Sequence, residues 1–267
     1  MDMLAIIGTG NMGRALTSGL VSKKIFRPSE IIGVDPVEAA QTEFLKISPE
    51  LRWAKTPKEA CAKASIILIA VKPQQIGEVV PQLENPQSLY LSIAAGVTIQ
   101  KLESLLGNTP RIVRAMPNTP ALLGCGVTAF AGNAHATSDD LTLAEKIFSA
   151  ISHTYRVSEE ELDAVTALSG SGPAYFYLFI DHLRKAAEAK GLNPKISLEM
   201  ISRTAFGAAQ MLLQTNQSPE KLISQVKSKG GTTEAALNAF SQQNFESLCA
   251  RAFDAAYLRS KELSQGG

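Results

Sequence analysis

The residues best suited to bind a cofactor form a glycine-rich turn near the start of the chain. The pattern Gly-x-Gly-x-x-Gly is carried by Gly8, Thr9, Gly10, Asn11, Met12 and Gly13. It lies between a short apolar run at residues 4–7 and a segment with helical spacing at residues 13–22, the context in which this pattern binds a dinucleotide. The first glycine allows a tight turn, the second lets a pyrophosphate approach the backbone, and the third lets helix and strand pack closely. N–H groups at the helix start favour the phosphate charge, although a glycine-rich turn without a ligand has the same pattern.

Charged residues follow two further apolar runs. Asp35 comes after the run at residues 31–34, where an acidic residue binds the ribose hydroxyls and disfavours a 2′-phosphate, which favours NADH. The alternative for Asp35 is a side chain that caps the next helix. A second candidate segment, at the end of the run at residues 66–71, consists of Ala70, Val71, Lys72 and Pro73. Lys72 could reach a phosphate or ribose oxygen, or it could be an ordinary surface lysine.

Two loops at later strand ends are candidates for the nicotinamide side. The first contains Ala95 and Gly96, whose small size would let a flat ring lie close to the backbone, although a tight turn needs the same residues. The second consists of Met116, Pro117, Asn118 and Thr119. Pro117, together with Pro120 directly after the segment, makes the loop rigid, and its place at a carboxyl strand end favours a role beside the nicotinamide. A rigid turn in which Asn118 bonds its own backbone is the alternative.

A second glycine-rich turn lies in the last quarter of the chain. It consists of Ser228, Lys229, Gly230, Gly231, Thr232 and Thr233, and it precedes a helix that we expect to start near Glu234. Glycines before a helix expose N–H donors, and the hydroxyls add donors and acceptors. Such a turn can hold a small carboxylate, and a plain helix cap is the alternative.

The elements that must position these turns predict an α/β first half. Short apolar runs, several of them continuous, are typical of parallel strands buried on both faces. They occupy residues 4–7, 31–34, 66–71, 89–94 and 112–115, with further short strands at 127–130 and 154–157. Segments with helical spacing separate them, as at residues 37–45 and 141–151. Strands that alternate with helices predict a doubly wound parallel sheet of the Rossmann type over residues 1–158.

The second half, residues 159–267, is predicted to be all-helical. We expect helices at residues 159–168, from Pro173 to a stop near Gly191, and then at 196–215, 219–225, 233–239 and 245–263. Two of these helices carry large apolar side chains nearly all round, over AYFYLFI and over residues 200–213. A helix of this kind must be buried on most of its faces. The pattern therefore predicts a dimerisation domain that a second subunit covers.

Composition excludes several function classes. The 267 residues carry a net charge of +1 and no long run of one sign, which argues against binding to nucleic acid or to an anionic membrane. No apolar run reaches the roughly 18 residues that span a bilayer. Three scattered cysteines and three scattered histidines lack the spacing of a metal site or a disulfide framework. With no leader pattern at the N-terminus, we expect a cytoplasmic protein without a metal.

The order of the motifs resembles that of the pyrroline-5-carboxylate reductases, the last enzymes of proline synthesis. The matching segments, across the whole chain, are GTGNMG, AVKP, SIAAGV, VRAMPNTP, GSGPAY and KGGTT. The resemblance implies a Rossmann domain, a helical dimerisation domain, and a substrate site at the dimer interface. It also implies larger rings of dimers, commonly decamers, and a preference for NADPH, with NADH accepted by many members.

Site roles carry over onto the matching residues. The resemblance puts residues 8–13 and 70–73 on the cofactor and residues 116–119 beside the nicotinamide. It gives the substrate carboxylate to Ser228, Gly230, Gly231 and Thr232, and a hydrogen bond to the ring nitrogen, hence the catalytic role, to Thr233. The family usually has proline where this chain has Lys229. Members that prefer NADPH tend to carry a small polar or basic residue where this chain has Asp35.

We therefore expect hydride transfer from NAD(P)H to 1-pyrroline-5-carboxylate, which yields L-proline. Three other functions are compatible with parts of the sequence. A β-hydroxyacid dehydrogenase uses a helix lysine beside a Gly-x-Gly, whereas this chain has Phe176 after Gly170-Ser171-Gly172. A cofactor-binding regulator without turnover would not need the KGGTT turn. No residue of the sequence distinguishes the expected function from that of an imine reductase for a ring of another size.

Overall fold

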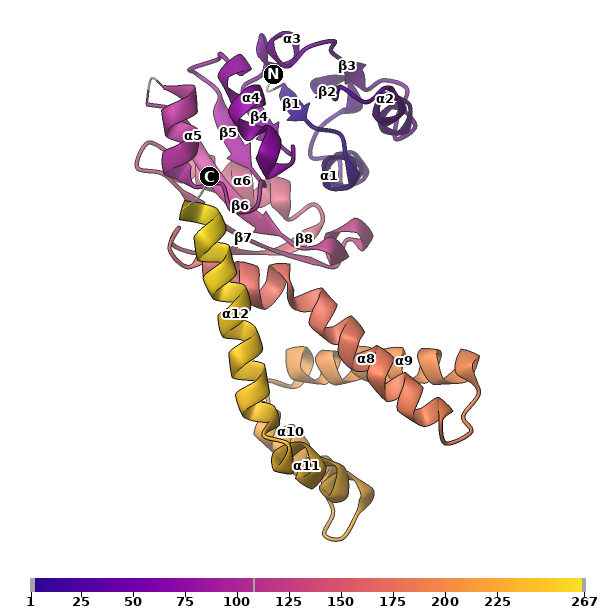
Figure 1. Ribbon diagram of the computed structural model, residues 1–267. Helices are drawn as coiled ribbons and strands as arrows, with labels where there is room; N and C mark the ends of the chain where they lie inside the picture. The colour runs from indigo at the N-terminus through magenta and orange to yellow at the C-terminus, as the bar shows by residue number, and fades with distance from the viewer. Residues whose placement is uncertain (1–2, 108, 266–267) are drawn as a thin grey trace. The chain divides into compact units, whose positions relative to one another are not determined.

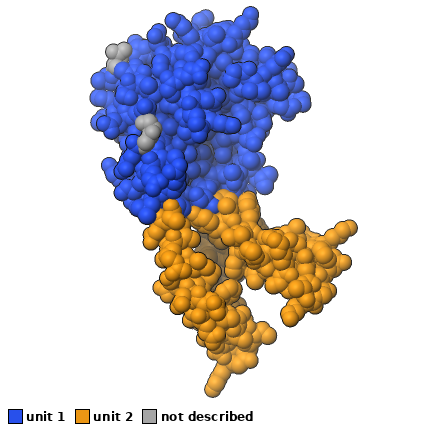
Figure 2. Space-filling model, in the orientation of Figure 1, with its two compact units in different colours: residues 1–171, 256–267 blue, residues 172–255 orange. Residues whose placement is uncertain are grey.

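The computed structural model describes residues 3–107 and 109–265, which form two compact units (Figure 2). One unit contains the chain up to Ser171 together with the stretch from Ala256 onward, and the other runs from Gly172 to Ala255. The sequence prediction places the domain boundary between residues 158 and 159 instead. Residues after 158 remain with the first unit because Leu162 is buried against Ala129 and Ala131 of the sheet.

The first unit is built on an eight-stranded sheet within the described residues (Figure 1). The strand order is β3-β2-β1-β4-β5-β6-β7-β8, and every neighbouring pair is parallel except β6 and β7. The strands are β1 (Leu4–Ile7), β2 (Ile31–Val34), β3 (Arg52–Trp53), β4 (Ile66–Ile69), β5 (Leu89–Ser92), β6 (Arg111–Pro117), β7 (Gly126–Gly132) and β8 (Ser152–Arg156). Every residue of β1, β2, β4 and β5 is buried, which confirms the interpretation of the continuous apolar runs as parallel strands covered on both faces.

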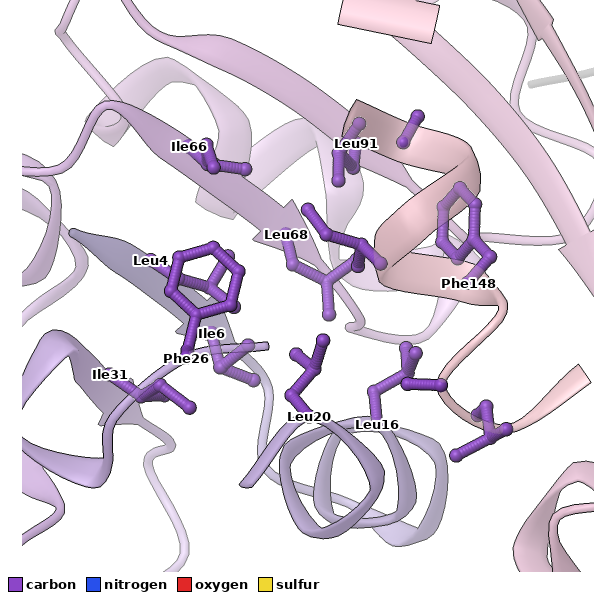
Figure 3. Close-up of a cluster of buried hydrophobic side chains, with 14 of the residues drawn as sticks. Leu4, Ile6, Leu16, Leu20, Phe26, Ile31, Ile66, Leu68, Leu91 and Phe148 are labelled. Carbon is purple, nitrogen blue, oxygen red and sulfur yellow. The ribbon is translucent and has the colours of Figure 1, made fainter. Parts of the chain in front are cut away.

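Helices cover both faces of this sheet, so the predicted doubly wound fold is confirmed. The helices are α1 (Asn11–Ser22), α2 (Glu38–Leu45), α3 (Pro57–Cys61), α4 (Ile76–Val79), α5 (Ile99–Leu106), α6 (Ser138–Phe148) and α7 (Leu162–Val165), with short 3₁₀ segments at Pro28–Glu30, Pro73–Gln75, Val80–Gln82 and Thr119–Leu123. On one face, alternate strand residues such as Ile6 and Leu68 pack against Leu16 and Leu20 of α1 and Phe148 of α6 (Figure 3). The residues between them, such as Ile7 and Ile69, pack on the other face against Ile76 of α4 and Leu102 of α5. This register places the loops that follow β1, β2, β4, β5 and β6 at the carboxyl edge of the parallel strands.

The second unit is helical. It contains α8 (Gly172–Glu188), α9 (Pro194–Thr215), α10 (Pro219–Val226), α11 (Thr232–Gln242) and the first part of α12 (Phe245–Gln265), whose last turns belong to the first unit. Proline at the first turn starts α9 and α10, because its missing N–H costs nothing there. Inside the unit, the ring centroid of Phe179 of α8 lies 6.1 Å from that of Phe240 and 6.4 Å from that of Phe245, and the last two lie 5.2 Å apart.

Large apolar side chains of the second unit remain exposed in the single chain. Phe176 of α8 is 66% exposed and Phe206 of α9 is 67% exposed. Similar exposure recurs along both helices at Tyr177, Leu178, Met200 and Leu213. Large apolar side chains exposed in this number are typical of an interface. None of the helices in the described residues is long and apolar enough to cross a membrane.

Candidate active site

The first glycine turn is closely packed at its first and third glycines and open at its second. Gly8 has a φ of +95°, and a Cβ there would lie 2.7 Å from the carbonyl oxygen of Ala70. A Cβ on Gly13 would lie 2.3 Å from the carbonyl oxygen of Gly8, so helix α1 can approach β1 only with glycine at this position. A Cβ on Gly10, in contrast, would meet no atom within 4 Å. The backbone of Gly10 therefore faces open space that a ligand can fill.

The start of α1 leaves its donors free. Gly10 is the N-cap residue, no side chain caps the helix, and no acidic residue lies in its first turn. The first N–H groups of a helix have no partner inside it, and they attract an anion. The hydroxyl of Thr9 is buried and has no hydrogen-bond partner among the described residues. These features fit a dinucleotide phosphate, and the assignment of residues 8–13 to a cofactor stays a prediction.

Asp35 has two structural partners. Its Oδ2 accepts a hydrogen bond from the N–H of Thr9 at 2.9 Å, and its Oδ1 accepts one from the N–H of Val37 at 3.0 Å. The second bond lies before helix α2 (Glu38–Leu45), whose N-cap residue is Val37 and which no side chain caps, so the capping alternative for Asp35 is wrong. The first bond holds the glycine turn from a residue far along the chain, and no local pattern indicates it. Asp35 therefore fixes the shape of the turn, whether or not it also contacts a ribose.

Two of the predicted loops line one small cavity. Residues 70–73 begin just after β4, which ends at Ile69 and not at Val71 as predicted, because the chain turns there into the 3₁₀ segment Pro73–Gln75. Gly96 has a φ of +72°, so its turn requires glycine. A cavity of about 150 Å³ is lined by residues of both loops, including Pro73, Gly77, Gly96 and Val97. Within these loops, the residues Lys72 and Ala95 are exposed.

Asn118 ties three segments together. Its Oδ1 accepts a hydrogen bond from the N–H of Val127 at 2.9 Å, and its Nδ2 donates to the carbonyl and the hydroxyl of Ser169, each at 3.2 Å. The alternative in which Asn118 bonds its own backbone is therefore wrong. Ser169 lies in the π-helical segment Thr166–Gly170, and a Cβ on Gly170 would lie 2.5 Å from Cε of Met116. Short π-helical segments occur frequently at functional sites.

An ion pair between a buried arginine and a partly buried glutamate, which the sequence analysis did not identify, supports the same region. Arg114 of β6 is 5% exposed, and its Nη1 lies 2.9 Å from Oε1 of Glu159. The same oxygen accepts a hydrogen bond from the N–H of Ile99 at 2.7 Å. Glu159 thus links β6, which leads to residues 116–119, with the start of α5, which follows Ala95 and Gly96. A charged residue within the apolar run VRAM is the signal that could have revealed it.

The second glycine turn is shaped by its own backbone and by Glu234. Gly230 has a φ of +74°, and its N–H donates to Oε2 of Glu234 at 2.8 Å. The N–H of Gly231 donates to the carbonyl of Ser228 at 3.0 Å. A Cβ on Gly231 would lie 2.3 Å from Oγ of Ser228, so this position requires glycine. The hydrogen bond from Gly230 and the charge of Lys227 lower the pKa of Glu234.

Helix α11 begins at Thr232, earlier than the expected start near Glu234. Gly231 has extended backbone angles and is the N-cap residue, so Thr232 and Thr233 both lie in the first helical turn. No side chain caps this helix. Its first N–H groups are therefore donors that suit a small carboxylate. The glycine turn of residues 8–13 lies in the first compact unit and this turn lies in the second.

No cluster of three or more His, Cys, Asp or Glu side chains that could hold a metal ion occurs in the part of the chain that the structure describes. Cys61, Cys125 and Cys249 are free thiols. Burial raises the pKa of the Cys61 thiol to about 12, so this thiol is not poised for reaction.

Comparison with known proteins gives consistent matches. A family model described as pyrroline-5-carboxylate reductase dimerisation matches residues 159–263, and one described as NADP oxidoreductase coenzyme F420-dependent matches residues 3–96. The first match starts where the sequence analysis places the start of the helical domain. It indicates that the chain associates with itself through its second half.

Curated relatives and solved structures agree with these models. The chain is similar to the pyrroline-5-carboxylate reductase of Synechocystis sp., with 37% identity over 98% of each chain. It is 37% identical to that of Pseudomonas aeruginosa, over 98% of this chain and 97% of the relative. A solved pyrroline-5-carboxylate reductase from Coxiella burnetii is 36% identical, with a TM-score of 0.91 and 98% of each chain covered. The Plasmodium falciparum pyrroline carboxylate reductase, solved with NADP bound, is 30% identical, with a TM-score of 0.89 and 98% of each chain covered.

Proposed function

The chain belongs to the pyrroline-5-carboxylate reductase family, and from this premise we propose that it reduces 1-pyrroline-5-carboxylate to L-proline with a nicotinamide dinucleotide, as the last step of proline biosynthesis. The observation that carries the proposal is the similarity to named reductases over almost the whole chain, at 37% identity. Both glycine turns precede helix starts that no side chain caps, which supports the proposed ligands.

The cofactor is a nicotinamide dinucleotide in this proposal. When bound, the reduced nicotinamide supplies the hydride. The N–H groups at the start of α1 would hold the pyrophosphate, and no side chain intrudes on the space at Gly10. NADP is bound in the solved Plasmodium falciparum relative, which supports NADPH as a cofactor. Residues 70–73, Ala95, Gly96 and residues 116–119 complete the proposed cofactor site.

The substrate is held by the second glycine turn in this proposal. Ser228, Gly230, Gly231 and Thr232 bind its carboxylate, and the first N–H groups of α11 supply donors for that charge. The hydroxyl of Thr233 hydrogen-bonds the ring nitrogen. An imine accepts hydride poorly until its nitrogen is protonated or strongly hydrogen-bonded, and a threonine hydroxyl, which is a weak acid, orients or relays that proton. Fixing the ring in reacting geometry contributes roughly 7–11 kcal/mol in the best cases.

The two turns belong to different compact units. The resemblance to the family places the substrate site at the interface of a homodimer. The exposed apolar faces of α8 and α9 support this assembly. Larger rings of dimers, as in a decamer, are the further expectation from the family.

The reaction is proposed to take place in the cytoplasm. All three thiols of the chain are free. Free thiols are typical of proteins in the reducing interior of the cell.

A direct test follows the oxidation of each reduced cofactor with 1-pyrroline-5-carboxylate and identifies the product. We expect oxidation that depends on the imine and yields proline in equal amount. A six-membered cyclic imine carboxylate and a set of β-hydroxyacids, the latter with oxidised cofactor, test the competing functions. Turnover with the six-membered ring alone, or with a hydroxyacid alone, would overturn the proposal.

Thr142→Ala is the matched control for substitutions in the substrate turn. Thr142 is exposed on α6; its hydroxyl donates to the carbonyl of Ser138 within the same helix and accepts a hydrogen bond from Nη2 of Arg156 at 3.3 Å. We expect this variant to have the wild-type rate, so a loss in Thr233→Ala can be assigned to the position of the hydroxyl.

A further inference from the structure

A guanidinium group lies directly on the first glycine turn. Arg14 is the first residue after Gly13 and lies in the first turn of α1. Its Nη1 donates to the carbonyl of Thr9 at 2.8 Å, and its Nη2 donates to Oδ1 of Asn11 at 2.9 Å. Arg14 lies just outside the pattern Gly-x-Gly-x-x-Gly, so the pattern gives it no role.

Arg14 and Asp35 each form a hydrogen bond with the backbone of the same residue, Thr9. The N–H of Thr9 donates to Asp35 and the carbonyl of Thr9 accepts from Arg14. One negative and one positive side chain therefore flank the backbone segment over which the dinucleotide is proposed to lie. A phosphate at this place is repelled by Asp35 and attracted by Arg14, so the balance of the two side chains sets how well the site accepts a phosphate.

Arg14 has donors left for a ligand. A guanidinium carries five N–H donors, and the two bonds to Thr9 and Asn11 leave three of them. No carboxylate in the described residues forms an ion pair with Arg14. Glu43 faces the same groove, of about 410 Å³, but its Oε1 is bonded by Nζ of Lys46 at 2.5 Å. Lys46 lowers the pKa of Glu43 by this hydrogen bond, and Arg14 lowers it further by its charge alone.

We propose that Arg14 binds the 2′-phosphate of the dinucleotide and thereby offsets Asp35, so that the site accepts NADPH as well as NADH. The inference rests on the proposed function only in that both require a dinucleotide over the glycine turn. Arginine suits this role because its planar fork stays charged and binds phosphate oxygens in pairs. It also explains how a chain with an acidic residue at position 35 can belong to a family with an NADP-bound member.

The test uses two probes that differ only in the phosphate. ADP-ribose and 2′-phospho-ADP-ribose are titrated by calorimetry into the full-length protein, wild type and Arg14→Met, at low and high salt. Neither probe contains nicotinamide, so binding is measured without reduction of an imine. We expect Arg14→Met to weaken 2′-phospho-ADP-ribose by roughly tenfold or more, as expected for loss of charge-assisted hydrogen bonds, and ADP-ribose by less than about threefold.

Lys23→Met is the matched control, because it removes the same charge from the other end of α1. Lys23 donates to the carbonyl of Ser149 and lies far along the helix from the glycine turn. We expect it to bind both probes like the wild type. Arg14→Lys keeps the charge without the paired donors and should fall between the wild type and Arg14→Met for the phosphorylated probe.

Three results would overturn the inference. An equal loss for both probes would place the guanidinium at the shared pyrophosphate and refute a role at the 2′-phosphate. Unchanged binding of both probes would show that Arg14 binds no phosphate. Binding of neither probe by the wild type would remove the dinucleotide site itself. A protein that binds both probes as expected but does not reduce 1-pyrroline-5-carboxylate would refute the proposed function and leave the inference standing.

Discussion

Substitution of Gly10 and Gly13 by alanine should separate ligand binding from folding. A Cβ on Gly13 would lie 2.3 Å from the backbone oxygen of Gly8, whereas real Cβ atoms do not approach closer than 3.0 Å. Both the Cβ at position 13 and the oxygen of Gly8 are fixed by the backbone, so helix α1 must move away from β1. We expect Gly13→Ala to lower the free energy of unfolding by about 3 kcal/mol, the upper end of the range for overpacked sites.

Gly10→Ala should leave the stability nearly unchanged and weaken cofactor binding. Gly10 has a negative φ of −64°, and its Cβ would meet no atom within 4 Å. We therefore expect a change in the free energy of unfolding of less than about 1 kcal/mol. The new methyl group would occupy the space proposed for the pyrophosphate, so cofactor affinity should fall by at least about tenfold, or roughly 1.4 kcal/mol.

Urea unfolding and fluorescence titration of the reduced cofactor measure the two quantities. Stability of Gly13→Ala equal to that of the wild type would refute the packing argument. Unchanged cofactor affinity in a folded Gly10→Ala would refute the place given to the pyrophosphate.

Four further predictions concern other parts of the molecule. Thr233→Ala should lower kcat at least about tenfold with little change in cofactor affinity, and steady-state rates at saturating imine would contradict the role of the hydroxyl if kcat stayed at the wild-type value. Arg114→Met should lower the free energy of unfolding by about 2–3 kcal/mol, because it leaves the partly buried Glu159 without its cation; chemical unfolding checks the value, and a change below about 1 kcal/mol would contradict it. Phe206→Asp places a charge on an exposed apolar face and should shift the protein toward a monomer in light scattering, whereas an unchanged mass would exclude this face from the interface. Glu234 has a lowered pKa, so the protection of the Gly230 amide from hydrogen exchange should be present above the ordinary carboxyl pKa, roughly 4.3, and lost as the pH falls through the lowered value; protection that did not depend on this range, or that persisted in Glu234→Gln, would argue against the contact.

Local patterns predict most of the first unit. Strands at Leu4–Ile7 and Ile31–Val34 match the predicted ranges, because continuous apolar runs of this length identify buried parallel strands. Strand β3 was not predicted, since Arg52 and Trp53 are too short a segment to show a pattern. The loops after the strands were predicted to be cofactor segments because this fold brings the carboxyl ends of the parallel strands to one edge of the sheet.

Contacts between distant residues could not be predicted in this way. The bond between Asp35 and Thr9, the bond between Asn118 and Ser169, and the pair of Arg114 with Glu159 each join segments far apart in the chain. The same limit applies to the boundary of the compact units, which depends on how Leu162 packs against the sheet. For the second unit, helical periodicity predicted the helices, and their exposed apolar faces in the single chain agree with the expected cover by another subunit.

The central claim is hydride transfer from the nicotinamide to the carbon of a cyclic imine. The most direct measurement supplies reduced cofactor that carries deuterium at the transferred position, together with unlabelled 1-pyrroline-5-carboxylate, and analyses the product by mass spectrometry. The account predicts L-proline with one deuterium at the former imine carbon, formed in equal amount to the oxidised cofactor. Cofactor oxidation without labelled proline, or no oxidation with either NADH or NADPH, would contradict it.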